Sequence, residues 1–252
     1  MITPPRQSFL GVEFALIDAE EALAWVERAV TSDAFSYLVT PNVDHIVMLH
    51  DDGVEPWRIA YREAVSAADL RINDSRILQR LARASGKALP VTPGSDLVRE
   101  LVQERAGKEG TIALIGGRSA EAAWLRTALP RHRIVHHEPP MGVRDSEAAQ
   151  QAIAAFVEGT VADICLFAIG APQSEIVCHR IQQRGRARGV ALCIGASVEF
   201  LSGAKSRAPA WMQAAGFEWF YRLASEPQRL WRRYLLRGPR IFRLWWSLEK
   251  GR

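Results

Sequence analysis

The sequence of 252 residues predicts an α/β protein: a mostly parallel sheet with helices on both faces, followed by a basic amphipathic helical C-terminal appendage. Short runs that are apolar throughout, rather than alternating, recur along the chain, as strands buried on both faces require. Helical patterns lie between these runs, which favours parallel strands joined by helices. The charge is concentrated at the end of the chain. Residues 217–252 hold nine basic and three acidic residues, so this segment is +6 while the whole chain is +4.

Seven apolar runs are the predicted strands. They are short and are bounded by polar or turn-forming residues, which is typical of buried strands. In chain order they are residues 10–16, 35–40, 69–72, 111–115, 133–136, 162–169 and 190–194.

Helical patterns fill the intervals between these runs. The first predicted helix, residues 18–30, opens with Asp18 and with Glu21 three positions later, which is a capping-box pattern. The others are predicted over residues 55–67, 76–84, 95–103, 121–129 and 146–158.

Cap and turn residues divide the C-terminal segment into two predicted helices. Ser225 with Gln228 forms a capping-box pattern, Pro227 lies in the first turn, and Gly238-Pro239 ends the helix. At about 100° per residue, this helix has one apolar and one basic face. The apolar face holds Leu230, Trp231, Tyr234 and Leu235, the basic face holds Arg229, Arg232, Arg233 and Arg237, and a second helix after Pro239 has Ile241, Leu244, Trp245 and Leu248 on one side.

The tryptophan content of the same segment favours contact with an anionic membrane surface. Four of the eight tryptophans lie in it, and arginine and tryptophan are both enriched where a helix lies in a headgroup layer. Docking of both helices on the body, with the arginines solvated, would also explain the pattern. A nucleic-acid partner ranks lower, because no recognised nucleic-acid motif accompanies the basic patch. We expect a catalytic domain over residues 1–208 and a membrane-associating helical appendage over residues 209–252.

Composition narrows the class further. The N-terminus does not resemble a signal peptide, and no stretch approaches the roughly 20 apolar residues of a spanning helix. We therefore expect a cytoplasmic protein that is peripheral on the inner face of the cell membrane. Cys165, Cys178 and Cys193 show no pattern, and core packing explains them better than a disulfide, a metal site or a nucleophile. The six histidines show no ligand spacing. We expect no metal site and no cofactor.

Polar or small residues follow five of the predicted strands. Ligands of a parallel sheet bind outside the carboxyl ends of the strands, so these residues predict a crevice. Alternatively, any one of these groups could simply form a turn, because Gly, Asn, Asp and Pro are common in turns. The five groups are Thr40-Pro41-Asn42, Asn73-Asp74-Ser75, Gly116-Gly117, Ala171-Pro172-Gln173-Ser174 and Gly195-Ala196-Ser197.

Two of these groups suggest particular chemistry. Asp74 could be a helix cap, but in a partly desolvated crevice its pKa would rise and it could act as a general base. Gly116-Gly117, ahead of a helix, could bring backbone amides close to a phosphate. Neither pattern identifies a ligand by itself.

Longer motifs resemble one family. The run GASVEFLSGAKSRAPAWMQAAGFEWFYRLASEPQRLWRRYL, residues 195–235, closely resembles the signature end of the WecG/TagA/CpsF glycosyltransferases, glycosyltransferase family 26. Supporting stretches occur in matching order: TPNVDH (40–45), ADLRIND (68–74), TPGSDLV (92–98), ALIGG (113–117) and AIGAPQSE (168–175).

The resemblance implies a Rossmann-like domain with a C-terminal appendage that targets the membrane. It implies inverting, metal-independent transfer of a sugar from a UDP-sugar to a lipid-diphosphate-linked saccharide, in bacterial exopolysaccharide, capsule or teichoic-acid-type synthesis. On the matching positions, Asp74 is the candidate base, and Thr40 and Asn42 would position hydroxyl groups. The implied substrate-binding residues are Gly116, Gly117, Gln173, Ser174 and Gly195, with Glu199 near the nucleotide and Arg222, Arg229 and Arg232 on the diphosphate.

Two departures from the family pattern bear on activity. Ser75 replaces the glycine that usually follows the base, and Ser174 stands where the family has its site glutamine. We interpret both as a change of sugar specificity. The alternative is a weakened member that acts as a membrane-bound binding or scaffold protein in an assembly complex. Donor sugar, acceptor and linkage are not determined by the sequence. The apolar faces of the C-terminal segment, residues 217–252 and called the tail below, predict either self-association or docking on the body.

Overall fold

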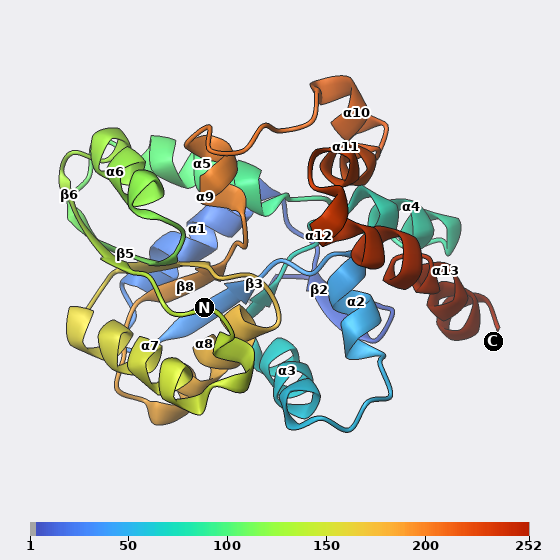
Figure 1. Cartoon of the computed structure of the whole chain (residues 1–252), viewed down its shortest axis with the longest axis horizontal. Coiled ribbons are helices and arrows are strands. Elements are labelled where there is room, and N and C mark those ends of the chain that lie inside the picture. Colours follow the sequence, from blue (N-terminus) through green and yellow to red (C-terminus); the bar gives the residue numbers. More distant parts are fainter. Residues whose placement is uncertain (1–3, 252) are drawn as a thin grey trace.

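The computed structural model describes residues 4–251 and contains one six-stranded sheet, in which every pairing is parallel. The strand order is β4-β3-β8-β7-β5-β6, and Figure 1 labels β6, β5, β8 and β3 along this order from left to right. This confirms the predicted α/β class and six of the seven predicted strands. The strands are β3 (Ser36–Val39), β4 (Leu70–Arg71), β5 (Gly110–Gly116), β6 (His132–His137), β7 (Ile164–Ala168) and β8 (Val190–Cys193).

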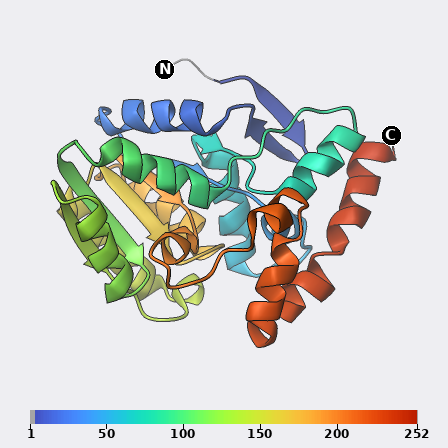
Figure 2. The same cartoon turned by 90° about the horizontal axis from the view of Figure 1, so that it is seen from above.

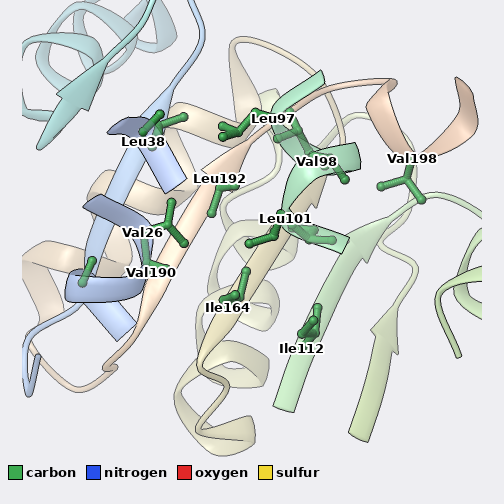
Figure 3. Packing of buried hydrophobic residues seen from close by; sticks show 14 of the residues in the cluster. Val26, Leu38, Leu97, Val98, Leu101, Ile112, Ile164, Val190, Leu192 and Val198 are labelled. Atoms are coloured by element: carbon green, nitrogen blue, oxygen red, sulfur yellow. The ribbon is translucent and has the colours of Figure 1, made fainter. Parts of the chain in front are cut away.

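Helices cover both faces of this sheet. On one face α1 (Ala19–Val30), α5 (Gly94–Arg105), α6 (Ser119–Ala128) and α9 (Ser197–Leu201) pack on a core that includes Val26, Leu38, Leu101 and Ile164 (Figure 3). The second core lies beneath α7 (Glu147–Thr160) and α8 (Gln173–Arg184), with α3 (Pro56–Ala67) packed against α8. Both faces of the strands are therefore buried, which is why the runs are apolar throughout.

The predicted helices form, with ends shifted by one or two residues in most cases. Asp18 accepts a hydrogen bond from the Glu21 amide at 2.9 Å, and Glu21 accepts one from the Asp18 amide, so the predicted capping box is confirmed. The helices α2 (Val43–Leu49) and α8 were not predicted, because both begin within groups of residues that are typical of turns. Asn42 caps α2, and α8 starts directly after Pro172.

Residues 10–16 do not form a strand of the main sheet, as the apolar run predicted. They belong to an antiparallel hairpin of β1 (Arg6–Phe9) and β2 (Val12–Ala15). Leu10 and Gly11 form its two-residue turn with φ of 50° and 74°, and two positive φ angles are what a tight hairpin requires. The run is interrupted at this turn, so it continues as β2 alone rather than as a full crossing strand.

The two predicted C-terminal helices form on either side of Gly238-Pro239, and each is an α-helix continued by a π-helical segment. They are α12 (Pro227–Trp231) with η2 (Arg232–Arg237) and α13 (Arg240–Trp245) with η3 (Trp246–Lys250). Two short helices that were not predicted, α10 (Ala210–Ala214) and α11 (Glu218–Ser225), precede them. Pro227 is in the first turn of α12, as predicted. Ser225 does not cap α12. It is the last residue of α11, where its hydroxyl donates to the Tyr221 carbonyl at 2.9 Å.

The end of this segment packs on the body. Ile241 is buried in a core made by the β1–β2 hairpin, α2 and α4 (Arg76–Ala84). Figure 2 shows the C-terminal helix, in red, beside α4, in teal. Two hydrogen bonds cross the same interface. The Leu10 amide donates to Glu249 Oε1 at 2.9 Å, and Trp245 Nε1 donates to Ser85 Oγ at 2.8 Å. Body docking, which the sequence left as an alternative, is therefore observed for α13 and η3.

Other apolar residues of the segment remain exposed. Leu230 is buried, but Trp231 and Leu235, predicted on the same face, are 40% and 52% exposed. Of the twelve exposed large apolar side chains among the described residues, eight lie after residue 208: Trp211, Phe217, Phe220, Trp231, Leu235, Leu236, Phe242 and Trp246. Within residues 4–251, no helix has the length and hydropathy to cross a membrane. The division at residues 208 and 209 stays a prediction.

Candidate active site

A cleft of about 1100 Å³ lies at the carboxyl ends of β4, β3, β8 and β7. Its floor is built from the residues that follow these four strands, and one wall comes from the C-terminal segment. The helices that follow β3 lead to one face of the sheet, whereas α9 after β8 lies on the other face. A crevice opens where neighbouring strands send their connections to opposite faces, and this places the cleft between β3 and β8.

Thr40 and Gly94 bring three elements together at the floor. The buried Thr40 hydroxyl donates to the Cys193 carbonyl at 3.0 Å, which joins the ends of β3 and β8. A Cβ at Gly94 would lie 3.2 Å from Ser197 Oγ and 3.6 Å from Thr40 Oγ1. The absence of a side chain at Gly94 therefore lets the start of α5 approach the two strand ends.

Asp74 lies at this floor with its side chain partly exposed to the cleft. Its Oδ1 accepts a hydrogen bond from the Gly94 amide at 3.1 Å. Burial raises the pKa of Asp74 to about 6 and Glu218 adds to the rise, while the Gly94 amide, His45 and the Asn42 side chain oppose it. Ser75, not Asp74, caps α4, because its hydroxyl accepts from the Leu78 amide at 3.3 Å. The Asp74 carboxylate is therefore not used as the cap of its own helix.

Asn42 lies beside Asp74. Its Oδ1 accepts from the Asp44 amide at 3.0 Å, and Arg233 Nη2 lies 3.5 Å from the same oxygen. With Oδ1 engaged in this way, the Nδ2 group is left to donate, and a side-chain hydrogen bond from Asn42 lowers the pKa of Asp74. Thr40, Asn42 and Asp74 thus converge, as their positions at adjacent strand ends predicted.

The β7–α8 turn supplies another part of the lining. Ser174 is buried, and its hydroxyl donates to the Gly170 carbonyl at 2.9 Å. The Gln173 amide donates to the Ile169 carbonyl. Both side chains therefore bond to their own turn. From the β8 side, Gly195 lines the cleft with φ of 52°, and Glu199 lines it while paired with Lys205 at 2.6 Å.

The tail arginines divide into two groups. Arg222 lies over the Phe200 ring at 5.4 Å, Arg229 pairs with Glu226 at 2.8 Å, and both line the cleft. Arg232 lies over the Trp231 ring and is not among the lining residues.

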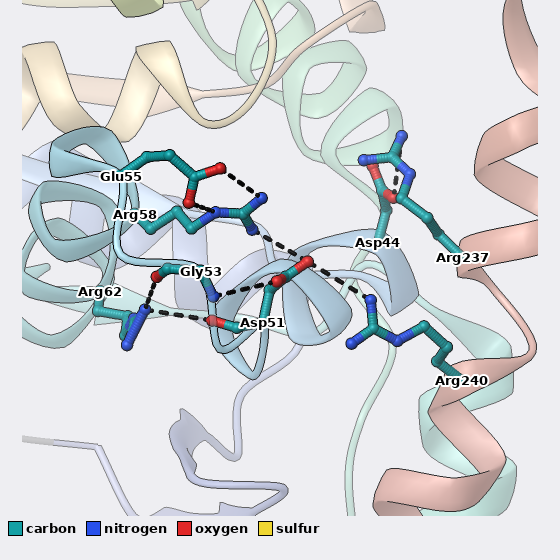
Figure 4. Close-up of polar contacts among 8 residues, drawn as sticks. All are labelled: Asp44, Asp51, Gly53, Glu55, Arg58, Arg62, Arg237 and Arg240. Carbon is teal, nitrogen blue, oxygen red and sulfur yellow. Dashed lines mark hydrogen bonds and ion pairs between the residues drawn. The ribbon is translucent and has the colours of Figure 1, made fainter.

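Arg233 and Arg237 line the cleft in place of Arg232, and both pair with Asp44, at 3.2 and 3.5 Å. Figure 4 shows the Arg237 pair and, next to it, Arg240 facing Asp51. These ion pairs attach the tail to α2 and to the loop that follows it.

Gly116 and Gly117 do not line the cleft. They end β5, and β7 lies between β5 and β8. A Cβ at Gly116 would lie 2.6 Å from Ile169 Cγ2, so this glycine is needed for close packing against the next strand. Their role toward a phosphate stays a prediction.

Several lining residues were not identified from the sequence. They are His45, Glu175, Arg207, Glu218, Arg233 and Arg237. His45 and Glu175 stand in the quoted TPNVDH and AIGAPQSE stretches, which was the available signal. Among residues 4–251 no cluster of three or more His, Cys, Asp or Glu side chains could hold a metal ion. The three cysteines are buried and unpaired, and burial raises the pKa of each thiol.

The comparison with protein families agrees with the motifs. The sequence model of the glycosyl transferase WecG/TagA/CpsF family matches residues 7–252, which is nearly the whole chain. The matched region includes the sheet, the cleft and the C-terminal segment.

Proposed function

This chain belongs to the WecG/TagA/CpsF family of glycosyltransferases, and we propose that it moves a sugar from a UDP-sugar to a lipid-diphosphate-linked saccharide. The proposed transfer inverts the anomeric centre, needs no metal, and serves bacterial surface-polysaccharide synthesis. One observation carries the proposal: a partly desolvated carboxylate, Asp74, faces a cleft whose opposite wall is rich in arginine.

Asp74 is the proposed general base. It takes the proton of the acceptor hydroxyl while that oxygen attacks the anomeric carbon and the bond to UDP breaks. A base with a pKa of about 6 is ionised at neutral pH yet basic enough to accept a proton in the transition state. Such a base contributes roughly 10²–10⁴ in rate. Attack from the face opposite the leaving group inverts the anomeric centre.

The arginines of the tail are proposed to bind diphosphate. UDP leaves with negative charge, and the acceptor carries a second diphosphate. Guanidinium groups pair bidentately with phosphate oxygens and can stabilise charge that develops in a closed site. Arg222 and Arg229 are the supporting residues, because both line the cleft. Arg232 would need to move to take part.

The tail is also the proposed membrane contact. Its exposed apolar side chains include Leu235 and Phe242, which lie at the cleft, and Trp246 further along. Exposed aromatic and basic residues on one segment are typical of a peripheral membrane surface. Each basic residue near an anionic leaflet adds about 1 kcal/mol, so attachment to the inner face of the membrane would be reversible and sensitive to salt. The lipid-linked acceptor would then meet the cleft at this surface.

The competing proposal is a weakened, membrane-bound scaffold, and Ser75 and Ser174 are its support. Ser75 caps α4, and the Ser174 hydroxyl is bonded to Gly170. Both side chains are thus accommodated by local structure and leave Asp74 accessible. This favours an active enzyme with altered sugar specificity.

The test is release of UDP. Purified protein is given UDP-glucose, UDP-galactose or their N-acetyl counterparts, with and without a prenyl-diphosphate-linked saccharide in detergent. The enzyme proposal expects one donor to release UDP only when the acceptor is present, and Asp74→Asn to abolish this release. A scaffold would bind UDP and release none from any donor. Acceptor-independent release of UDP would contradict transfer.

A further inference from the structure

Glu175 is a buried carboxylate that the proposed chemistry does not use. It is 1% exposed in α8, and a buried charge is costly unless it has a partner. Among the ion pairs of the described residues, its partner is His45, whose Nε2 lies 3.4 Å from Glu175 Oε1. The second carboxylate oxygen has no hydrogen-bond partner in the part of the chain that the structure describes.

His45 connects this carboxylate to the start of α2. Its Nδ1 accepts a hydrogen bond from the Asn42 amide at 3.3 Å. With Nδ1 acting as acceptor, the proton of a neutral imidazole is on Nε2, which faces Glu175. Apolar and aromatic residues wall the pair: Tyr61 is fully buried with its ring 6.4 Å from that of His45, and Ile176 belongs to the same cluster. The pair borders the cleft but is nearly buried, and polar contacts between buried groups are stronger than they are in water.

The contacts continue to the reacting group. Asn42, whose backbone is held by His45, uses its side chain both to cap α2 and to bond Asp74. Glu175, His45, Asn42 and Asp74 thus form one chain of contacts. It links α8, which follows β7, to the ends of β3 and β4.

We propose that Glu175 and His45 are positioning residues, which hold Asn42 and through it the Asp74 carboxylate in the geometry for transfer. This inference rests on the proposed function of Asp74 as base. The physical argument is that a catalytic group misplaced by about 1 Å can lose about 100-fold in rate. The Glu175–His45 pair holds the residues that follow β3 and β4 against the start of α8, which follows β7. Loss of the pair would therefore shift Asp74 without removing it.

Matched variants separate positioning from a simple structural role. His45→Gln and Glu175→Gln preserve the contact, because a glutamine amide at position 45 reaches both neighbours and a glutamine carbonyl at position 175 still accepts a hydrogen bond. His45→Asn keeps an acceptor for the Asn42 amide but does not reach Glu175. Glu175→Leu has similar volume but no acceptor. Glu175→Leu also leaves the Nε2 proton of His45 without its acceptor, which can lower stability, so the thermal midpoint of this variant is measured alongside its activity.

The measurements are kcat and donor KM for UDP release under the assay above, together with thermal unfolding. We expect His45→Asn and Glu175→Leu to lose about 10- to 100-fold in kcat, with KM within about threefold, when both are assayed well below their thermal midpoints. The two glutamine variants are expected to stay within about threefold of wild type. The double variant His45→Asn/Glu175→Leu is expected to lose no more than either single variant, as members of one chain of contacts do.

Three results would overturn the inference. They are equal kcat in contact-preserving and contact-breaking variants, additive losses in the double variant, or losses that follow unfolding alone. Failure of the proposed function is separate, because wild type would then release no UDP from any donor. In that case ¹⁵N NMR decides: a proton on His45 Nε2, and an Asn42 side-chain amide signal that moves in Glu175→Leu but not in Glu175→Gln, support the chain of contacts. Their absence refutes it.

Discussion

Ile241→Ala tests whether the end of the tail is part of the folded body. Ile241 is 1% exposed and packs in the core formed by the hairpin, α2 and α4. The substitution removes three carbon groups, worth about 0.8 kcal/mol each in transfer free energy, and leaves a cavity. We expect the free energy of unfolding to fall by about 3 kcal/mol, within the roughly 2–5 kcal/mol range for such changes. This is a large share of the roughly 5–15 kcal/mol that stabilises a typical domain.

The neighbouring residue provides the control. Phe242 is 56% exposed, so Phe242→Ala is expected to change the free energy of unfolding by less than about 0.5 kcal/mol. The assay is urea unfolding monitored by circular dichroism. The two variants are compared with wild type only if the dependence of the unfolding free energy on urea concentration is the same in all three proteins. Vesicle binding is expected to show the opposite pattern: Phe242→Ala weakens binding to anionic vesicles, and Ile241→Ala leaves it unchanged while the protein is folded. A loss below about 1 kcal/mol for Ile241→Ala would refute docking of α13 in solution.

Four further predictions concern the site and the tail. Because burial raises the pKa of Asp74 to about 6, the base is protonated below that pH, and wild-type kcat/KM should fall about tenfold per pH unit there. The pKa of Asp74 is higher in the folded than in the unfolded protein, so ionisation of Asp74 lowers the free energy of unfolding as pH rises from about 4 to 6, and this loss stays constant at higher pH. Asp74→Asn should therefore unfold at no lower temperature than wild type at pH 8. A lower thermal midpoint for this variant would contradict the prediction. Arg229→Ala should lower kcat more than Arg232→Ala, because of these two arginines only Arg229 lines the cleft. The affinity of each variant for UDP, measured by calorimetry, is the control. Equal losses of kcat would show that the tail rearranges on binding. Binding of the full chain to anionic vesicles should weaken as salt rises from about 0.05 to 0.5 M, and indifference to vesicles at low salt would remove the membrane proposal.

Local patterns determined the strands, most helices and the strand-end residues of the site. A strand buried on both faces must be apolar along its length, so the strand within residues 162–169 could be predicted from local composition. A capping box needs only two residues three positions apart, so the Asp18 cap could be predicted from residues close in sequence. Asp74 and Asn42 could be placed together because the carboxyl ends of parallel strands meet at one edge. The +6 charge and the tryptophans of residues 217–252 are likewise properties of composition alone.

Strand order and helix phase were decided only by the tertiary structure. Gly116 and Asp74 both follow strands, but β5 lies outside the cleft because three strands separate it from β4. In the tail, Leu230 and Trp231 are neighbours in α12, but the rest of the protein covers only part of the predicted apolar face, which buries Leu230 and leaves Trp231 exposed. The Glu175–His45 pair joins residues 130 positions apart. No pattern of spacing encodes such a contact, since it exists only once the β7–α8 turn has packed beside α2.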